Sequence, residues 1–324
     1  MGYHLKSRPI GVSVIICCYN SSKSIFRTLE CLSLQEELIF PFQVIVVNNN
    51  SNDNTVGIVE EFINKSNLNI KLVHEFMPGL MHAREAGLKN AKYEYIQFCD
   101  DDNFLSPNYI VSIFKIFNKN ELIGACGGLG IPLLDVVKTP IWFDYYKKSF
   151  AVGSQKKNPQ DHLYGAGVAI RYSALEAIYN KGFKSFLTGR KGGVLLAGDD
   201  GELILALMIC GYELHASDDF YFHHFIKQAR LQKEYLYKLH FGFGMMYPVI
   251  DIYRDFLRTK KIYSSFKYKM KFTFKIIKSF LVIFLKRGIN RKVQINLFKG
   301  ALRGFLYYFN DYNKIILVIN KLKK

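Results

Sequence analysis

The sequence predicts an α/β fold in which a parallel or mostly parallel sheet is flanked by helices. Strand-like apolar runs alternate with helical patterns over the first 115 residues, and each run ends in polar turn residues. Parallel strands need a crossover connection, usually a helix, so this alternation is typical of β-α-β units. Apolar residues make up 49% of the 324 residues, which is enough for a core and excludes a disordered chain.

Four strands and the helices between them follow in order. The strands are short runs rich in β-branched and aromatic residues, expected at Val12–Cys18, Phe42–Val47, Ile70–His74 and Tyr95–Cys99. Helices, in which apolar residues recur every three or four positions, are expected at Ser24–Ser33, after Asp53, at Met81–Lys89 and at Pro107–Phe117.

The next segment changes character, because glycines cluster at 124–130 and at 165–167. Short strands and loops are expected there. They are followed by a predicted helix at Gly201–Cys210 and by predicted strands at Glu213–Ala216 and Phe220–Phe225.

Three adjacent carboxylates, Asp100, Asp101 and Asp102, come directly after the fourth strand. Like charges at the end of a buried strand are costly unless a cation binds them. Mg²⁺ and Mn²⁺ prefer oxygen ligands and usually share them with substrate phosphates, so the triplet predicts a metal–phosphate site. The triplet alone leaves open the alternative of a solvated acidic turn.

Loops at 19–23, 48–54 and 100–103 all follow carboxyl ends of predicted strands, where ligands of α/β sheets bind. We expect them to converge on one crevice. Tyr19 could stack there on a nucleobase and Asn49 could bind its edge, although a packed tyrosine and a turn asparagine fit equally well. Arg84, on the third predicted helix, could balance phosphate charge or lie on a solvated helix face.

Asp200 lies in a second acidic group, at the start of the predicted helix 201–210. It could be a general base for a substrate hydroxyl if this helix start faces the crevice, or merely a helix cap. His223 and His224 are neighbours on a strand, so at most one faces the crevice. We take His224 as the candidate metal ligand, with a packed, hydrogen-bonded histidine as the alternative.

Together these motifs resemble family 2 glycosyltransferases of the GT-A fold. The resemblance covers roughly residues 10–230 and is carried in chain order by residues 12–20, 46–55, 79–87, 95–102, 165–167 and 198–203. It implies a GT-A-like catalytic domain at 1–230, followed by a basic, amphipathic helical region at 231–324. Within the domain, the nucleotide-sugar half would be about 10–115 and the acceptor half about 116–230.

The resemblance also implies roles for single residues. Tyr19 and Asn49 would contact the nucleobase, and Asp101 would lie on the ribose or phosphate side. The family commonly has Asp where this chain has Asn48 and Asn49. A carboxylate accepts a hydrogen bond from a uracil N–H more strongly than an amide does.

Asp100 would open a D-x-D pattern in which Asp102 binds a divalent metal, Mn²⁺ or Mg²⁺, and Asp200 would be the catalytic base. Asp199 stands where Glu is usual in the family. The implied activity is inverting transfer of a sugar from a nucleotide diphosphate, with a UDP-sugar as the expected donor. The acceptor would be a hydroxyl of a glycan or lipid-linked molecule in surface polysaccharide synthesis.

Two other functions are weighed against this one. A sugar-nucleotide nucleotidyltransferase would be expected to carry a glycine-rich, basic loop after the first strand, and residues 18–22 are not such a loop. A non-catalytic basic protein that binds membrane or nucleic acid would not need both Asp102 and Asp200.

The basic character belongs to the end of the chain. Residues 251–324 hold 19 of the 44 Lys and Arg residues but 3 of the 27 Asp and Glu residues. On a helix, Lys267, Lys271, Lys275 and Lys278 would form one stripe beside bulky apolar residues, which suits an anionic membrane surface. A helix packed on the catalytic domain fits the pattern as well.

We expect no nucleic-acid partner, because the sequence carries no recognised binding motif. The six cysteines include no C-x-x-C pair, as in proteins of a reducing compartment. The expected location is therefore the cytoplasm, peripheral to the inner face of the cell membrane.

Overall fold

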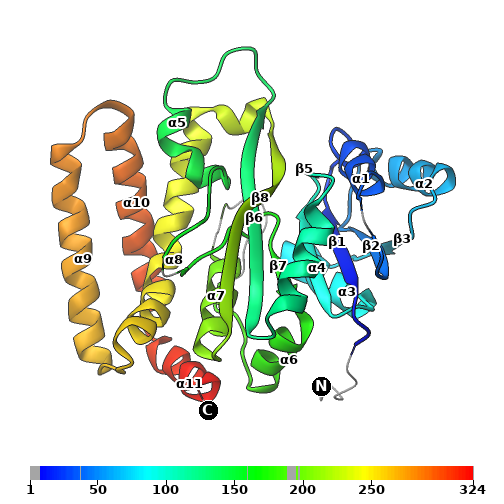
Figure 1. Cartoon of the computed structure of the whole chain (residues 1–324). Coiled ribbons are helices and arrows are strands. Elements are labelled where there is room, and N and C mark those ends of the chain that lie inside the picture. The colour runs from blue at the N-terminus through cyan, green and yellow to red at the C-terminus, as the bar shows by residue number, and fades with distance from the viewer. Residues whose placement is uncertain (1–7, 37, 159, 188–194, 196–197, 324) are drawn as a thin grey trace.

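The computed structural model describes residues 8–323 except for residues 37, 159, 188–194 and 196–197. These described residues form a mixed sheet with the strand order β3-β2-β1-β4-β7-β6-β8-β5, flanked by helices (Figure 1). The α/β fold predicted from the sequence is therefore confirmed.

The first half of the sheet is parallel, as predicted. β1 (Val12–Cys18) lies between β2 (Phe42–Asn48) and β4 (Tyr95–Asp100), and β3 (Ile70–His74) pairs with the other edge of β2. Side chains alternate between the faces of a strand, so both faces of β1 are buried in hydrophobic cores. Near-continuous apolar runs were the signal that made these strands predictable.

The second half is mixed. β7 (Ala169–Arg171) is antiparallel to both β4 and β6 (Ile123–Leu134), while β8 (Glu213–Ile226) runs parallel to β6 and antiparallel to β5 (Asn103–Leu105). The two strands predicted at 213–216 and 220–225 are one strand, whose register against β6 shifts between Gly127 and Leu129.

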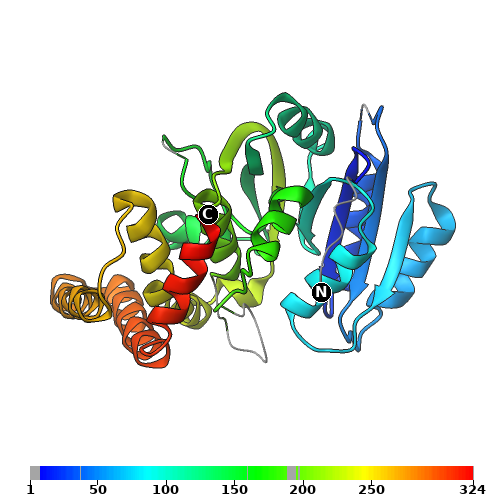
Figure 2. The same cartoon turned by 90° about the horizontal axis from the view of Figure 1, so that it is seen from below.

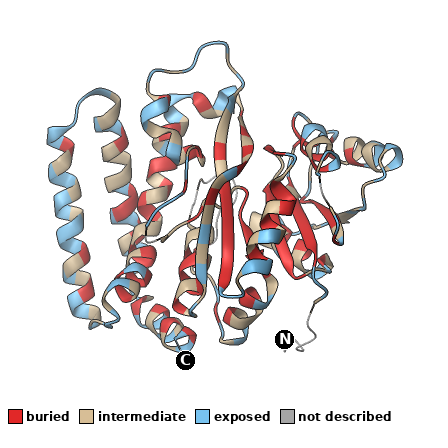
Figure 3. Ribbon diagram, viewed as in Figure 1, coloured by how far each residue is buried: buried red, intermediate tan, exposed pale blue. Residues whose placement is uncertain are grey.

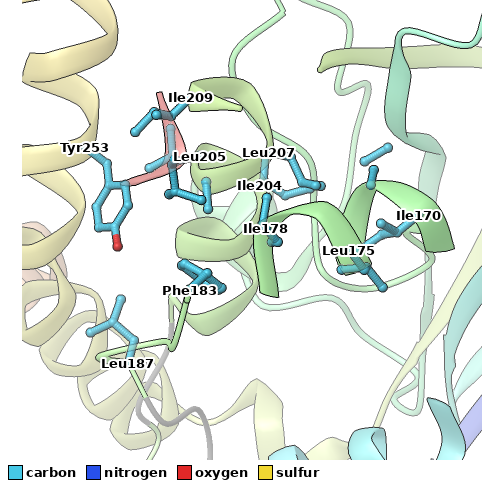
Figure 4. Close-up of a cluster of buried hydrophobic side chains, with 14 of the residues drawn as sticks. Ile170, Leu175, Ile178, Phe183, Leu187, Ile204, Leu205, Leu207, Ile209 and Tyr253 are labelled. Atoms are coloured by element: carbon cyan, nitrogen blue, oxygen red, sulfur yellow. The ribbon is translucent and has the colours of Figure 1, made fainter. Parts of the chain in front are cut away.

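Two layers of helices cover the sheet. The layer on one face comprises α1 (Ile25–Ser33), α2 (Thr55–Lys65) and α4 (Tyr109–Lys119). The other face packs against α3 (Leu80–Asn90), α6 (Tyr172–Asn180) and α7 (Asp199–Ile209). Figure 4 shows how α6 and α7 share a core with Tyr253 of the C-terminal region.

The start of α7 differs from the prediction in a way that matters for the site. The helix begins at Asp199, two residues before the predicted start, so Asp199 and Asp200 lie in its first turn. Acidic side chains are favourable there because the N-terminus of a helix carries partial positive charge.

The C-terminal region is helical, as predicted. It consists of α8 (Lys233–Thr259), α9 (Ser265–Leu285), α10 (Gly288–Tyr307) and α11 (Tyr312–Leu322). Short helical segments, α5 (Phe143–Tyr146), η1 (Lys147–Phe150) and η2 (Gln228–Leu231), pack with the start of α8. Among the described helices, none has the length and apolar character that crossing a membrane requires.

Glycines allow α8 and α10 to lie in close contact. A Cβ atom at Gly244, Gly300 or Gly304 would overlap backbone atoms of the opposite helix. α9 lies outside this pair, at the edge of the molecule (Figures 1 and 3). The view from below shows the C-terminal helices on the opposite side of the molecule from β1, β2 and β3 (Figure 2).

Candidate functional site

The loops that follow β1 and β2 meet, as predicted from their position at strand ends. The backbone N–H of Asn20 donates to Ser51 Oγ at 3.1 Å, and the backbone N–H of Ser21 donates to Thr55 Oγ1 at 2.8 Å. Asn20 and Asn50 adopt left-handed backbone conformations, with φ of 54° and 59°, which asparagine tolerates better than most residues. These turns bring the two loops onto one edge of the sheet.

The acidic loop after β4 is tied to the same place. Ser21 Oγ donates a hydrogen bond to the Asp101 carboxylate, and Thr28 Oγ1 donates to the Asp101 carbonyl oxygen at 2.8 Å. Burial and the neighbouring Asp102 raise the pKa of Asp101 to about 7. Burial raises the pKa of Asp100 in the same way, with Asp102 adding to it. The predicted convergence of three loops is thus confirmed, and it concentrates negative charge.

Asp102 is the most enclosed member of the triplet, with 2% of its surface exposed. Its Oδ2 accepts a hydrogen bond from Arg230 Nη1 at 2.9 Å, and its Oδ1 lies 3.7 Å from His224 Nε2. Arg230, on η2, was not singled out from the sequence. Arg230 follows β8, the strand that carries His223 and His224, by a few residues. That spacing alone does not reveal an ion pair with Asp102.

The structure separates the two histidines. His224 is buried, and its Nδ1 lies 2.6 Å from the Phe150 carbonyl oxygen, so Nδ1 must be the donor of that bond. In the neutral ring, Nε2 then turns a lone pair toward Asp102. His223 lies beside Tyr221, in a different hollow of about 240 Å³ that Arg27 and Cys31 also line. His224 is therefore the histidine beside the triplet, as predicted, and its role as a ligand remains a prediction.

The second acidic group meets Arg84 of α3. Arg84 Nη1 lies 3.1 Å from Asp199 Oδ2 and also forms an ion pair with Asp200. Burial, which disfavours the charged form, and the nearby Asp200 raise the pKa of Asp199 to about 7. Burial alone would lower the pKa of Arg84, but Asp200 and Asp199 outweigh it and raise that pKa.

Arg84 is therefore not on a solvated helix face, because two carboxylates at the start of α7 hold its guanidinium and buried carboxylates need a nearby cation. Its contact with donor phosphates stays a prediction. Gly165 packs so closely against Asp200 that a Cβ atom there would overlap the carboxylate. The glycine cluster at 165–167 thus makes room for Asp200.

Tyr19 and Asn49, the two predicted nucleobase contacts, differ in how far their side chains are exposed. Tyr19 is 64% exposed at the end of β1, so its ring is available for stacking. Asn49 is buried, and its Nδ2 donates to the carbonyl oxygens of Glu75 and Met77 at 2.9 and 2.8 Å. Its Oδ1 accepts from the Gly79 amide at 2.8 Å. The Asn49 side chain thus holds the loop before α3, and its contact with a nucleobase stays a prediction.

Glu202 is a further carboxylate in the first turn of α7. It is fully buried and accepts hydrogen bonds from Ser185 Oγ, the amides of Phe186 and Leu187, and Tyr253 Oη, at distances between 2.6 and 3.0 Å. These bonds join the start of α7 to α8. Glu202 is therefore a structural link between the site and the C-terminal region.

Comparison with known proteins agrees with this geometry. The sequence model of Glycosyl transferase family 2 matches residues 13–178, which is about half of the chain. The chain belongs to glycosyltransferase family 2. The matched segment contains β2, β4, the acidic triplet and all of β1 except Val12, so the resemblance inferred from the motifs is confirmed.

Relatives of this family 2 member include polysaccharide and teichoic acid enzymes. The chain is 35% identical over 121 residues to a poly-beta-1,6-N-acetyl-D-glucosamine synthase of Staphylococcus epidermidis, a match that covers 36% of this chain and 28% of the relative. It is 36% identical over 94 residues to the poly(ribitol-phosphate) beta-N-acetylglucosaminyltransferase TarS of Staphylococcus aureus, covering 29% of this chain and 16% of that protein. Each match therefore spans less than a third of the relative.

Solved structures show the same fold over nearly the whole chain. The mannosyltransferase PcManGT from Pyrobaculum calidifontis, in complex with GDP-Man and Mn²⁺, superposes with a TM-score of 0.57 at 15% identity, covering 93% of this chain and 91% of that one. TarS 1–349 in complex with UDP gives 0.51 at 16% identity, covering 94% and 92%. The mixed sheet and the helical C-terminal region are therefore shared with GT-A glycosyltransferases.

Proposed function

We propose that this protein is an inverting, metal-dependent glycosyltransferase that moves a sugar from a nucleotide diphosphate to a hydroxyl acceptor in surface polysaccharide synthesis. The carrying observation is that two acidic groups lie close to each other, since, besides burial, Asp200 contributes to the raised pKa of Asp100 in the triplet. Asp102 faces His224 at the strand ends, while Asp200 lies at the start of α7 beside Arg84. The first group suits a divalent cation that would bind a diphosphate, and the second suits a reacting hydroxyl.

The residues around Asp102 fit a hard divalent cation. Arg230 binds Asp102 Oδ2 at 2.9 Å, while Asp102 Oδ1 lies 3.7 Å from His224 Nε2, so Oδ1 and Nε2 are the two atoms that a cation could share. Asp102 and His224 would hold Mn²⁺ or Mg²⁺. The described residues include no group of three or more His, Cys, Asp or Glu side chains placed to bind a metal, so donor phosphates and water would complete the shell. When bound, the ion would supply charge stabilisation to the departing nucleotide diphosphate.

Asp200 is the proposed base. Its side chain is 29% exposed, so an acceptor hydroxyl can reach it, and Arg84 holds it in position. In the transfer step, Asp200 takes the proton of the acceptor hydroxyl while that oxygen forms a bond to the anomeric carbon and the bond to the diphosphate breaks. Arg84 and the start of α7 fix the direction from which the acceptor approaches.

The exposed ring of Tyr19 is the proposed contact for the nucleobase of the donor, because it can stack on a base. A UDP-sugar is the proposed donor, and two relatives, a poly-beta-1,6-N-acetyl-D-glucosamine synthase and a beta-N-acetylglucosaminyltransferase, support a hexosamine as the first sugar to test. The proposed acceptor is a glycan or a lipid-linked glycan.

A variant that loses sugar transfer but keeps nucleotide binding would test this proposal. We expect Asp200→Asn to lower sugar transfer by about 10²- to 10⁴-fold, the usual contribution of a general base. Its affinity for UDP with Mn²⁺, measured by calorimetry, should stay within a few-fold of wild type. Asp311→Asn, which removes a carboxylate that pairs with Lys314 at the start of α11, is the matched control and should transfer normally. Full activity of Asp200→Asn would contradict the assignment of the base.

A further inference from the structure

The outward face of α9 is apolar along its whole length. Eight of its large apolar side chains are between 44% and 80% exposed, namely Phe266, Met270, Phe274, Ile277, Phe280, Leu281, Phe284 and Leu285. At about 100° per residue they fall within an arc of about 140°. We call these eight residues the α9 apolar face. An apolar face of this size is expected to be covered by something.

The opposite face of α9 fixes this orientation. Tyr268, Phe272 and Ile283 are buried against the neighbouring helices. Lys275 pairs with Asp251 of α8 at 2.6 Å, and Lys271 pairs with Asp255. Because these contacts lock the helix, the α9 apolar face cannot turn inward.

These ion pairs correct the interpretation of the lysine stripe. The stripe was expected to face a membrane, yet Lys271 and Lys275 face α8, because its two carboxylates attract them. Lys267 and Lys278 lie at one border of the α9 apolar face, and Lys269 lies at the other, where its Nζ sits 3.4 Å from the centre of the Phe309 ring. The apolar face is thus bordered by cations on both sides.

The charges around the α9 apolar face favour an anionic bilayer over a second copy of the chain as the partner that covers it. α9 contains no acidic residue, and Lys286 and Arg287 follow it directly, both exposed. A second copy of the chain would bring the same cations together and would be repelled. An anionic bilayer offers hydrocarbon to the apolar face and negative headgroups to the lysines that border it.

We propose that α9 lies in the plane of an anionic lipid bilayer, with its apolar face inserted at the boundary between headgroups and acyl chains. At 1.5 Å per residue, its 21 residues give a contact about 30 Å long. This inference does not depend on the proposed transfer reaction, since none of the residues of the α9 apolar face belongs to the two acidic groups.

Co-sedimentation of the full-length protein with phosphatidylcholine vesicles, with and without 30% phosphatidylglycerol, tests the proposal. We expect binding to the anionic vesicles that weakens as salt rises. Phe274→Asp combined with Ile277→Asp should lower the partition coefficient at least about tenfold. Leu122→Asp is the matched control, because it places a charge on an exposed leucine before β6, and it should bind as wild type does.

A spectroscopic variant covers the case in which the double variant does not fold. Phe274→Trp in a Trp142→Phe background places one tryptophan on the α9 apolar face. We expect a blue shift of its emission on adding anionic vesicles, and quenching by lipids brominated near the headgroup end of the acyl chain.

Two outcomes would overturn the proposal. One is wild-type protein that does not sediment with anionic vesicles at low salt. The other is a wild-type dimer in analytical ultracentrifugation that the double variant converts to a monomer, because the face would then be covered by a second copy.

Discussion

Asp102 shows how far a single residue can be interpreted without a structure. The run of three aspartates after a buried strand predicts a site of concentrated negative charge, and the structure places all three at the strand ends. It does not predict Arg230, which neutralises Asp102 from 128 residues away along the chain. Such a pair depends on the path of β8 and η2, and no local pattern encodes it.

Asn49 shows a limit of the sequence. Its place in an asparagine-rich turn fitted either a nucleobase contact or a turn, and its side-chain amide makes three hydrogen bonds to backbone groups of the loop before α3. Asparagine in a turn has this competing use, and sequence alone does not distinguish the two.

The raised pKa of Asp199 makes a prediction about pH. Its value of about 7 in the folded protein lies above the ordinary 3.8, so the folded state holds a proton that the unfolded state has released between about pH 4 and 7. Over this window the free energy of unfolding should therefore fall as pH rises, by at most about 1.4 kcal/mol per pH unit from this residue. Asp199→Asn should make the profile flatter.

Urea denaturation at pH 5.0, 6.0 and 7.0 measures this difference. Asp218→Asn, a more exposed carboxylate on β8, serves as the control and should keep the wild-type slope. Equal slopes for wild type and Asp199→Asn would show that Asp199 titrates normally in the folded protein.

At the scale of elements, strands buried on both faces were predictable and the glycine-rich strand was not. β1 to β4 are short, nearly continuous apolar runs, and their boundaries match the prediction to within one residue. β6 was expected to be loops and short strands because of its glycines. Those glycines instead allow close packing: a Cβ atom at Gly128 would lie 2.7 Å from the Phe220 carbonyl oxygen of β8.

The same argument applies to the α8–α10 contact and gives a stability prediction. Gly244→Ala would place a methyl group against backbone atoms of α10, which cannot yield as a side chain can. We expect it to lower the free energy of unfolding by about 1–3 kcal/mol, more than the gain from better helix propensity.

Gly201→Ala is the control for that experiment. The nearest atom to its Cβ would be Ile250 Cδ1 at 3.7 Å, an ordinary contact in a helix. Its stability should stay equal or rise by up to about 1 kcal/mol. If urea denaturation shows the two substitutions to be equally tolerated, the tight α8–α10 packing is wrong.

At the scale of the whole molecule, the C-terminal region is part of the fold and not a detachable tail. Tyr253 of α8 donates to the buried Glu202 of α7 at 3.0 Å, and Lys181 Nζ reaches the Leu322 carbonyl oxygen at 3.1 Å. Charge composition predicted that this region is distinct, but the sequence did not show which lysines pair inward. Point substitutions on α9 are therefore a better probe of membrane docking than truncation.

The most direct test of the central claim is calorimetric titration of UDP, GDP, dTDP and CMP, with and without Mn²⁺, into wild type and Asp102→Ala. We predict that one nucleotide diphosphate binds wild type in a Mn²⁺-dependent manner and that Asp102→Ala loses this binding while remaining folded. Absence of nucleotide binding to folded wild-type protein, or binding that needs neither Mn²⁺ nor Asp102, would contradict the proposed donor site.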